Sequence, residues 1–362
     1  MKLGAREILG VPRLPPSRLS QSVARARARV GRLHAVMAPP PLAILEGLFG
    51  LLDHGGLVSL CELGVPDVLD APCSIDDLAR RLAVDEGQLE RVIRYAAARH
   101  WLRLDRRGRV RPTSVTRFLR RDHPGGWRAW VDFAGASDVT AAVAALGAGI
   151  RRGDEPYALA NGQRFFDRMR DDPARGSTFD AAMSAGGRMH GLALAAAIDW
   201  SAARRVCDVG GGDGSLLRVL LAEQAHLAGV LLDVPAVVAR AVPADRLTTV
   251  AGDAFLGVPA DCDTYLFVNV IHDWHDDDAV RLLARAAADA PSGARIVVVE
   301  AERRLRPIDD VALRTDLLML ALAPGGRERT TNELQALAGR AGLRRTRSVR
   351  LATNDIAHVL TR

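Results

Sequence analysis

Residues 205–214 read Arg-Val-Cys-Asp-Val-Gly-Gly-Gly-Asp-Gly, a short apolar run that passes directly into four glycines. The run is typical of a buried strand, and the glycines let the backbone turn sharply and come close to a ligand. A dinucleotide fingerprint, G-x-G-x-x-G, would require a third glycine at 215, where Ser215 stands. Because the loop has no Lys or Arg, it offers little to a pyrophosphate. We therefore expect it to bind a nucleoside without phosphates.

The chain after residue 200 alternates short apolar runs with helical stretches. The further runs are residues 229–233, 249–253, 264–270 and 295–300, and segments near 344–352 and 356–361 could add two edge strands. Such alternation predicts an α/β fold with a doubly wound parallel sheet, whose ligands lie at the carboxyl ends of the strands. We predict that residues 201–362 form this Rossmann-like domain.

Three acidic residues stand at successive strand ends beside the glycines. Asp208 closes the first run, and Asp233 follows the second, 25 residues later, where a carboxylate can accept both hydrogens of a ribose diol. Asp233 could instead cap the helix that begins near Val234. Asp253 precedes Ala254-Phe255, a place from which a carboxylate and an apolar face could hold adenine.

The N-terminal part predicts a helical domain. A Leu-rich helical stretch over residues 42–69 precedes two short helices that Ser74 and Asp85 can cap, and residues 101–113 alternate around a glycine like a hairpin. This order is the outline of a winged helix, at residues 39–122. Residues 123–200 predict a helical linker and substrate cap that holds many of the bulky apolar side chains.

The formal net charge of +6 invites a nucleic-acid interpretation, so its location matters. Eight basic residues lie within residues 1–34 against the single acidic residue Glu7, and the rest of the chain is close to neutral. We predict that residues 1–38 are a disordered basic leader, with Met37 a possible alternative start, and that the protein binds no nucleic acid. No secretory signal or membrane span is expected, and four scattered cysteines indicate neither disulfides nor a metal site. We expect a cytoplasmic protein.

Five ordered motifs resemble those of the S-adenosylmethionine-dependent small-molecule O-methyltransferases, the family of plant caffeic-acid and flavonoid, hydroxyindole and bacterial antibiotic-tailoring enzymes. They are Val206–Gly214, Asp233–Pro235, Gly252–Phe255, Val270–Asp277 and Pro324–Thr330. The resemblance spans residues 42–362 and implies an N-terminal winged-helix dimerisation domain, a homodimer, S-adenosylmethionine as cofactor and a phenolic or other hydroxylated acceptor.

The resemblance also implies roles for residues. His272 matches the catalytic base, and Glu300 and Glu328 match the two carboxylates that flank it. The cofactor-binding residues would be Asp208, Gly210, Gly212, Asp233, Asp253, Ala254 and Asn269. The acceptor-binding residues would be Phe166, Met169, Met183, Asp273, Trp274 and Met319.

Elementary chemistry agrees with a histidine base. Methyl transfer from a sulfonium needs an oxygen that has lost its proton, and a phenol with a pKa near ~10 is mostly protonated at neutral pH. A neutral imidazole can take that proton, and a carboxylate on its far nitrogen would fix the tautomer. Two alternatives stay open: His272 bonded to backbone at a helix start, and Glu300 or Glu328 as an ordinary ion-pair partner, the latter between Arg327 and Arg329.

Other functions also stay open at this point. Many plant members carry a lysine where Val268 stands, so the cofactor carboxylate must be held differently and a plant-type phenylpropanoid acceptor is disfavoured. A relative could use the same cofactor for hydroxylation or decarboxylation. A ligand-sensing DNA regulator is disfavoured by acidic residues in residues 88–99 and just before them, and an NAD dehydrogenase by the glycine spacing.

Overall fold

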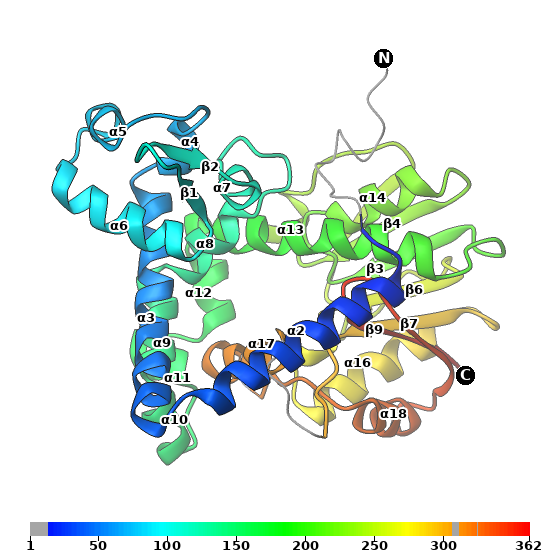
Figure 1. Ribbon diagram of the computed structural model, residues 1–362. Helices are drawn as coiled ribbons and strands as arrows, with labels where there is room; N and C mark the ends of the chain where they lie inside the picture. Colours follow the sequence, from blue (N-terminus) through cyan, green and yellow to red (C-terminus); the bar gives the residue numbers. More distant parts are fainter. Residues whose placement is uncertain (1–13, 306–310, 324) are drawn as a thin grey trace.

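The computed structural model describes residues 14–305, 311–323 and 325–362. Figure 1 shows a helical N-terminal part and a sheet-containing C-terminal part, and the long helix α13 (Pro173–Ala197) runs from one to the other. The C-terminus lies on the side of the sheet domain.

Helix α2 (Ser17–Met37) is the first described element, and its presence corrects part of the sequence prediction. We expected residues 1–38 to be a disordered leader, but Ser17–Met37 form a regular helix, while residues 1–13 lie outside the described residues. No residue of α2 is buried. Packing within this chain therefore contributes little to its stability.

Helix α3 (Pro40–Glu62) follows after Pro39 and begins with two prolines, whose fixed φ suits the first helical turn. It is long and apolar enough to cross a membrane by length and composition, although we expected no such segment. Its second half packs on α6 and α8 of the N-terminal domain. Its first half is solvent-exposed and apolar, for example at Ile44, Leu48 and Leu51.

The N-terminal domain continues with short helices and a hairpin, in the predicted order. Its elements are α4 (Val65–Val68), α5 (Ile75–Leu82), α6 (Glu86–Ala98), β1 (Leu102–Leu104), β2 (Val110–Pro112) and α7 (Ser114–Phe118). The Ser74 hydroxyl accepts a hydrogen bond from the Asp77 N–H, and the Asp85 carboxylate accepts one from the Gln88 N–H. Both predicted helix caps are confirmed, because each satisfies an amide that the helix leaves free.

The middle of the chain is helical, as predicted. Its elements before α13 are α8 (Arg128–Ala134), α9 (Ser137–Ala144), α10 (Leu146–Arg152), α11 (Pro156–Asn161) and α12 (Phe165–Asp171). They gather around an aromatic cluster that includes Phe133, Tyr157 and Phe165. The Tyr157 and Phe165 rings meet edge to face, with centroids 5.3 Å apart.

The C-terminal domain is a seven-stranded sheet with strand order β5-β4-β3-β6-β7-β9-β8. The strands are β3 (Arg205–Val209), β4 (Ala228–Asp233), β5 (Leu247–Ala251), β6 (Thr264–Val268), β7 (Arg295–Glu300), β8 (Arg344–Arg350) and β9 (Ile356–Thr361). Strands β3 to β7 are parallel, and β8 and β9 form an antiparallel extension. Of these two, only β8 lies at the edge, because β9 pairs with β7 as well. The prediction of two edge strands is therefore corrected to one.

Helices cover both faces of the sheet (Figure 1). They include α13 and α14 (Ser215–Glu223) on one face and α16 (Asp276–Asp289) and α18 (Thr331–Arg340) on the other. The remaining elements of this part are α15 (Pro235–Val238), the 3-10 turn η1 (Ile271–Asp273) and α17 (Val311–Leu322), and α17 packs on α9 and α11 of the helical middle. Side chains of β4 alternate between the two cores: Val230 and Leu232 join the core under α16 and α18, and Leu231 joins the core under α13 and α14. This is why the central parallel strands β4, β6 and β7 are mostly apolar.

The order of the strands fixes where a ligand can bind. The chain runs from β3 to β4 and β5 on one side and continues with β6 and β7 on the other, so the connections diverge between β3 and β6. In sheets of this kind a crevice opens at the carboxyl ends of the strands at this switch point. The loops that end β3 and β6 are the glycine-rich loop and the segment that carries His272.

Candidate active site

The glycine-rich loop leaves β3 in a conformation that only glycine adopts easily. Gly210, Gly212 and Gly214 have φ of +71°, +63° and +78°. At Gly211 a Cβ atom would stand 2.5 Å from the Asp208 carboxylate and 2.6 Å from Leu231. The loop therefore leaves bare backbone facing the crevice above Asp208.

Asp208 lies under this loop and is 2% exposed. Its Oδ2 accepts no hydrogen bond from the described residues, and burial, followed by the charge of Asp233, raises the pKa of Asp208 to about 8. An unpartnered buried carboxyl oxygen is costly, so a donor group on a bound ligand would stabilise the site.

Asp233 ends β4 as predicted and is held by backbone. Its Oδ2 accepts from the Gly212 N–H at 2.9 Å, and its Oδ1 accepts from the Val234 N–H at 2.7 Å. The pKa of Asp233 is raised, chiefly by burial. Each carboxylate oxygen keeps lone-pair capacity for a further donor, which suits the two hydroxyls of a ribose.

Asp253 and Ala254 lie just beyond β5. Asp253 is exposed, and its carboxylate accepts from the Phe255 N–H at 2.9 Å. The Phe255 ring meets the Trp274 ring edge to face, with centroids 4.7 Å apart. Trp274, predicted to bind the acceptor, therefore lies beside the segment predicted to hold adenine, in a different cluster from the other acceptor candidates.

Asn269 closes β6 with an exposed side chain and a φ of +54°, a left-handed conformation that is uncommon outside glycine and that Asn tolerates better than most residues. Its N–H donates to the Val299 carbonyl at 3.0 Å. The chain then turns into η1, which begins at Ile271 and places His272 next to the crevice.

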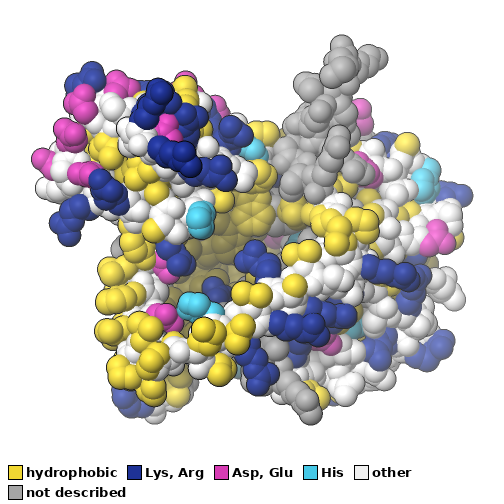
Figure 2. Space-filling view, in the orientation of Figure 1, with side chains coloured by type: hydrophobic (Ala, Val, Ile, Leu, Met, Phe, Trp, Pro, Cys, Tyr) yellow, Lys and Arg dark blue, Asp and Glu magenta, His cyan; other side chains and the backbone are white. Residues whose placement is uncertain are grey.

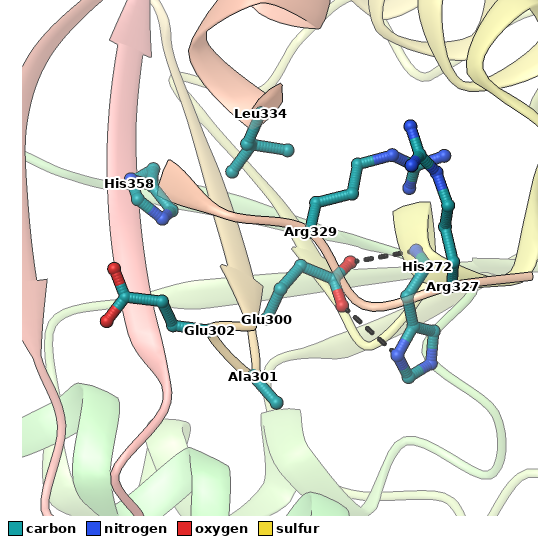
Figure 3. A pocket seen from close by; sticks show the side chains of 8 residues that line it. All are labelled: His272, Glu300, Ala301, Glu302, Arg327, Arg329, Leu334 and His358. Carbon is teal, nitrogen blue, oxygen red and sulfur yellow. Dashed lines mark hydrogen bonds and ion pairs between the residues drawn. The ribbon is translucent and has the colours of Figure 1, made fainter. Parts of the chain in front are cut away.

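His272 lies beside two buried carboxylates, that of Glu300, which Figure 3 shows, and that of Glu328. Its Nδ1 is 3.1 Å from Glu328 Oε1 and 3.4 Å from Glu300 Oε2. Glu300 Oε1 accepts from the N–H groups of Ile271 and His272, at 2.9 and 3.2 Å. The other ring nitrogen, Nε2, lies 3.6 Å from Asp273 Oδ1. This arrangement differs from both alternatives: His272 is not bonded to backbone alone, and its carboxylate partners do not lie at the surface.

The electrostatics of this group are dominated by burial and by the imidazole–carboxylate attraction. Burial acts to lower the pKa of His272, but the charges of Glu300, Asp273 and Glu328 outweigh it and raise that pKa to about 10. Burial raises the pKa of Glu300 to about 7 and that of Asp273 to about 6, with the charge of His272 opposing both. One oxygen each of Glu300 and Glu328 is buried without a hydrogen-bond partner among the described residues.

His272, Glu300 and Glu328 also satisfy a distance test for a metal site, with ligand atoms within 4.8 Å of one another. We expect no metal from the sequence. The contacts of His272 Nδ1 and Glu300 Oε1 give each of these atoms a protein partner, which supports that expectation, and it stays a prediction.

Arg329 is a residue of the site to which the sequence pattern assigned no role. It is 5% exposed, and its guanidinium donates to the Ile271 carbonyl at 2.9 Å and the Trp274 carbonyl at 2.7 Å. It also pairs with Asp276 at 2.8 Å. These bonds hold the segment of His272 from both ends. The only signal in the sequence was that Arg329 follows Glu328 within one motif.

A small cavity lies behind His272, on the side of Glu300 and of the two arginines 327 and 329 (Figure 3). Glu302, Leu334 and His358 line its far end. It is too small for an aromatic acceptor, which must enter from elsewhere.

Three of the predicted acceptor side chains, Phe166, Met169 and Met183, lie in the helical middle of the chain. Met169 belongs to the aromatic cluster, Met183 packs against it, and the Phe166 ring lies 5.2 Å from that of Phe165. Met319 is half-buried on α17, next to Leu318 of the same cluster. Figure 2 shows a hollow with an apolar floor between the N-terminal and sheet domains.

A second buried histidine supports the site from below. His190 on α13 has Nε2 2.8 Å from Asp355 Oδ2, and its Nδ1 lies 3.1 Å from the Gly186 carbonyl. Burial acts to lower the pKa of His190, but the bond to Asp355 outweighs it and the pKa is raised. The pair joins α13 to the turn between β8 and β9.

The four cysteines all lie within the described residues and are free thiols. Cys61, Cys207 and Cys262 are buried and Cys73 is half-buried. The expectation that they are mostly buried is confirmed, and that they are reduced in the cell stays a prediction.

Comparisons with known proteins agree with this geometry. Residues 143–344 match a family model described as an O-methyltransferase domain, and residues 45–122 match an O-methyltransferase dimerisation domain. A 2,7-dihydroxy-5-methyl-1-naphthoate 7-O-methyltransferase of Streptomyces carzinostaticus is 32% identical over 80% of this chain and 92% of its own.

Two further matches bear on cofactor and reaction. A crystal structure of NcsB1, an O-methyltransferase from neocarzinostatin biosynthesis, holds S-adenosylmethionine and 2-hydroxy-5-methyl naphthoic acid; it has a TM-score of 0.70 and 29% identity, covering 85% of this chain and 95% of its own. Aclacinomycin 10-hydroxylase RdmB of Streptomyces purpurascens is 37% identical over 66% of this chain and 67% of its own.

Proposed function

Because the chain belongs to the O-methyltransferase family, we propose that His272 is the general base with which it deprotonates a hydroxyl group of its acceptor. The chain is an S-adenosylmethionine-dependent O-methyltransferase of the secondary-metabolite type. The observation that supports the role of His272 is the placement of its Nδ1 within 3.1–3.4 Å of two buried carboxylates, which leaves Nε2 for the acceptor.

The cofactor supplies an electrophilic methyl group on a positively charged sulfur. The residues of this chain fit it: the bare loop at Gly210 and Gly212 gives close approach, and the open oxygen of Asp208 can accept from an ammonium group. We propose that Asp233 accepts from the ribose hydroxyls and that Asp253 and Ala254, with Asn269 nearby, border the rest of the nucleoside and the methionine part. Trp274, beside Phe255, is proposed to flank the adenine.

The neighbouring carboxylates determine what fraction of His272 is protonated. Because these carboxylates raise its pKa to about 10, His272 is mostly protonated at neutral pH. A positive charge bound beside it lowers that pKa, so neutral His272 is more abundant in the cofactor-loaded enzyme. A phenol with a pKa near ~10 then transfers its proton to a base of similar strength, at little cost in free energy.

Glu328 and Glu300 have different proposed tasks. Glu328 receives the Nδ1–H, which fixes the tautomer and stabilises the imidazolium after proton transfer. Glu300 is bonded through Oε1 to two backbone amides, so it holds the turn that carries the base. Orientation of oxygen, methyl and sulfur in line accounts for much of the remaining acceleration.

The acceptor is proposed to be a hydroxylated aromatic or polyketide-type metabolite. The apolar hollow suits a flat ring, and we propose Phe166, Met169, Met183 and Met319 as contacts of the acceptor and Asp273 as a residue close to the reacting oxygen. We further propose a homodimer formed through the dimerisation domain, and a cytoplasmic location that suits the free cysteines.

Calorimetric titration with S-adenosylmethionine, S-adenosylhomocysteine and NAD, followed by a screen of phenols and naphthols, tests this function. We expect the adenosyl ligands to bind and NAD not to bind. His272→Ala should lose turnover and keep cofactor affinity. Equal loss of cofactor affinity would assign His272 a structural role.

The hydroxylase relative makes hydroxylation a second candidate. Mass spectrometry of the product separates the two reactions, because methyl transfer adds CH2 and hydroxylation adds one oxygen. Methyl transfer is preferred here, since the neutral form of His272 can receive the proton of a hydroxyl at Nε2 while its Nδ1–H donates to Glu328.

A further inference from the structure

Helix α2 presents an apolar surface that nothing in the described part of its own chain covers. Its apolar residues recur at alternating intervals of four and three, the spacing of a coiled-coil seam. The seam consists of Leu19, Val23, Ala26, Val30, Leu33 and Met37. All six are exposed, with 50% to 72% exposure for the five large side chains.

The opposite side of α2 faces the body of its own chain. The half-buried residues there are small or polar, namely Ser17, Ser20, Gln21, Ala24 and Ala28. The helix therefore turns its apolar side away from the protein. An amphipathic helix normally buries that side, so the arrangement predicts an external partner.

Both ends of α2 are tied down, which holds the seam in place. Leu14, just before the helix, packs against Leu192 and Val219 of the catalytic domain, and the other end continues into α3. Figure 1 shows α2 crossing from the sheet domain to α3, and Figure 2 shows it bordering the hollow between the two domains.

The charges on α2 exclude one partner. The helix carries five arginines and no acidic residue, and none of the five forms an ion pair with a carboxylate in the part of the chain that the structure describes. Arg27 and Arg29 flank the seam at Val30 on its two sides. Two α2 helices placed seam to seam would oppose these like charges, which disfavours their pairing.

The first half of α3 has the complementary property. It is apolar on all sides, exposed at Leu42, Ile44, Leu48 and Leu51 among others, and Glu46 is the one charged residue between 40 and 52. From residue 45 on it belongs to the segment that matches the dimerisation domain, and its start follows α2 closely. A second copy of the chain would bring such an apolar, weakly acidic surface to the seam.

We propose that the seam of α2 packs on the first half of α3 in a second copy of this chain, so that α2 extends the dimer interface beyond residues 45–122. The proposal rests on the proposed homodimer and deepens it. Because α2 spans the two domains beside the hollow, packing of the partner on α2 would also fix the distance between these domains and with it the width of the acceptor cleft. Dimer contacts and acceptor binding are therefore coupled.

Sedimentation velocity of the full chain with Val30→Asp and Gly31→Asp tests this interface. The two substitutions add the same charge to adjacent residues, but Val30 lies in the seam and a Cβ at Gly31 meets open space. We expect Val30→Asp to weaken dimerisation about a hundredfold, since each dimer loses two buried valines, and Gly31→Asp to leave it unchanged. The KM for the acceptor should rise in Val30→Asp while affinity for S-adenosylhomocysteine stays the same.

The outcomes separate the two proposals. A chain that is monomeric at all concentrations overturns both, whereas an unweakened Val30→Asp dimer overturns only the role of α2. Binding of monomeric protein to phosphatidylglycerol vesicles, abolished by Val30→Asp, would assign the seam to a membrane surface instead. Far-ultraviolet circular dichroism of both variants checks that the helices remain.

A second measurement tests the choice of α3 over α2 as the partner surface. In a Cys73→Ser background, which removes the half-buried thiol, pyrene is attached to Val23→Cys. We expect monomer fluorescence in the dimer, because each pyrene meets α3 of the partner. Excimer emission would show that the two α2 helices pair with each other and would overturn the proposed arrangement.

Discussion

Replacing Glu328 by Gln tests how much the negative charge of Glu328 raises the pKa of the proposed base His272. The substitution keeps the shape of the side chain and an oxygen that can accept the Nδ1–H of His272, but it removes a negative charge 3.1 Å from that nitrogen. Glu328 is 1% exposed, so solvent does not screen the interaction. The pKa of His272, now about 10, must fall.

The size of this fall can be bounded. Two unit charges 3.1 Å apart at an effective dielectric constant of ~20 attract by about 5 kcal/mol, and the retained hydrogen bond offsets part of the loss. We expect the pKa of His272 to fall by about 1–3, which corresponds to about 1.4–4 kcal/mol. The same change in Glu300, whose contact is 3.4 Å, should also unsettle the turn at Ile271.

The assay is the dependence of kcat/KM for the acceptor on pH. The acidic limb should move to lower pH by about 1–3 pH units in Glu328→Gln, because neutral His272 forms at lower pH, while the plateau falls because a weaker base assists less. The C2 proton of His272, followed by nuclear magnetic resonance and assigned with His272→Gln, reports the same pKa directly. Glu302→Gln is a matched control, since Glu302 pairs with Arg350 and Thr331 and not with His272.

A Glu328→Gln curve that is lower throughout but has its acidic limb in the same place would refute this reasoning. It would mean that Glu328 supports the fold of the site and does not set the pKa of His272.

Buried charges elsewhere in the chain give three further expectations. Arg329→Gln leaves the carbonyls of Ile271 and Trp274 and the carboxylate of Asp276 without their donor. The free energy of unfolding, measured by urea denaturation, should therefore fall by about 3–5 kcal/mol. An unchanged free energy of unfolding would show that water replaces the guanidinium. Asp233→Asn should weaken S-adenosylhomocysteine binding about 10–100-fold by calorimetry, and unchanged affinity would place the ribose elsewhere. His190→Gln should cost most stability below about pH 6.5 and progressively less as pH rises through the raised folded pKa of His190; a cost independent of pH would contradict the charged pair.

The centre of the sheet could be predicted in detail because strands β3, β4, β6 and β7 are buried on both sides. The strands Arg205–Val209 and Arg295–Glu300 have the predicted bounds, since continuous apolar residues leave few alternatives. The place of β9 between β7 and β8 could not be predicted, because pairing order depends on long-range hydrogen bonds and not on local pattern.

The site was predictable where one residue type is tied to one backbone position. The glycines with positive φ and Asp233, which ends its strand, are of this kind. Arg329 and Trp274 are not, because their roles depend on which distant carbonyl or ring they meet after folding. The helix at Ser17–Met37 was missed because five arginines without any acidic residue are equally typical of a disordered basic leader.

The left-handed backbone of Asn269 also limits how this enzyme can diversify. Most residues with a side chain need about 1–2 kcal/mol to adopt a φ of +54°. A substitution at this position must therefore first be compatible with the backbone, before any contact with a ligand matters. Glycine tolerates this conformation but removes the side chain, whereas aspartate tolerates it and adds a charge beside the cofactor cleft. Laboratory evolution toward new acceptors should therefore leave this position almost unchanged and accumulate its accepted changes in the helices around the hollow.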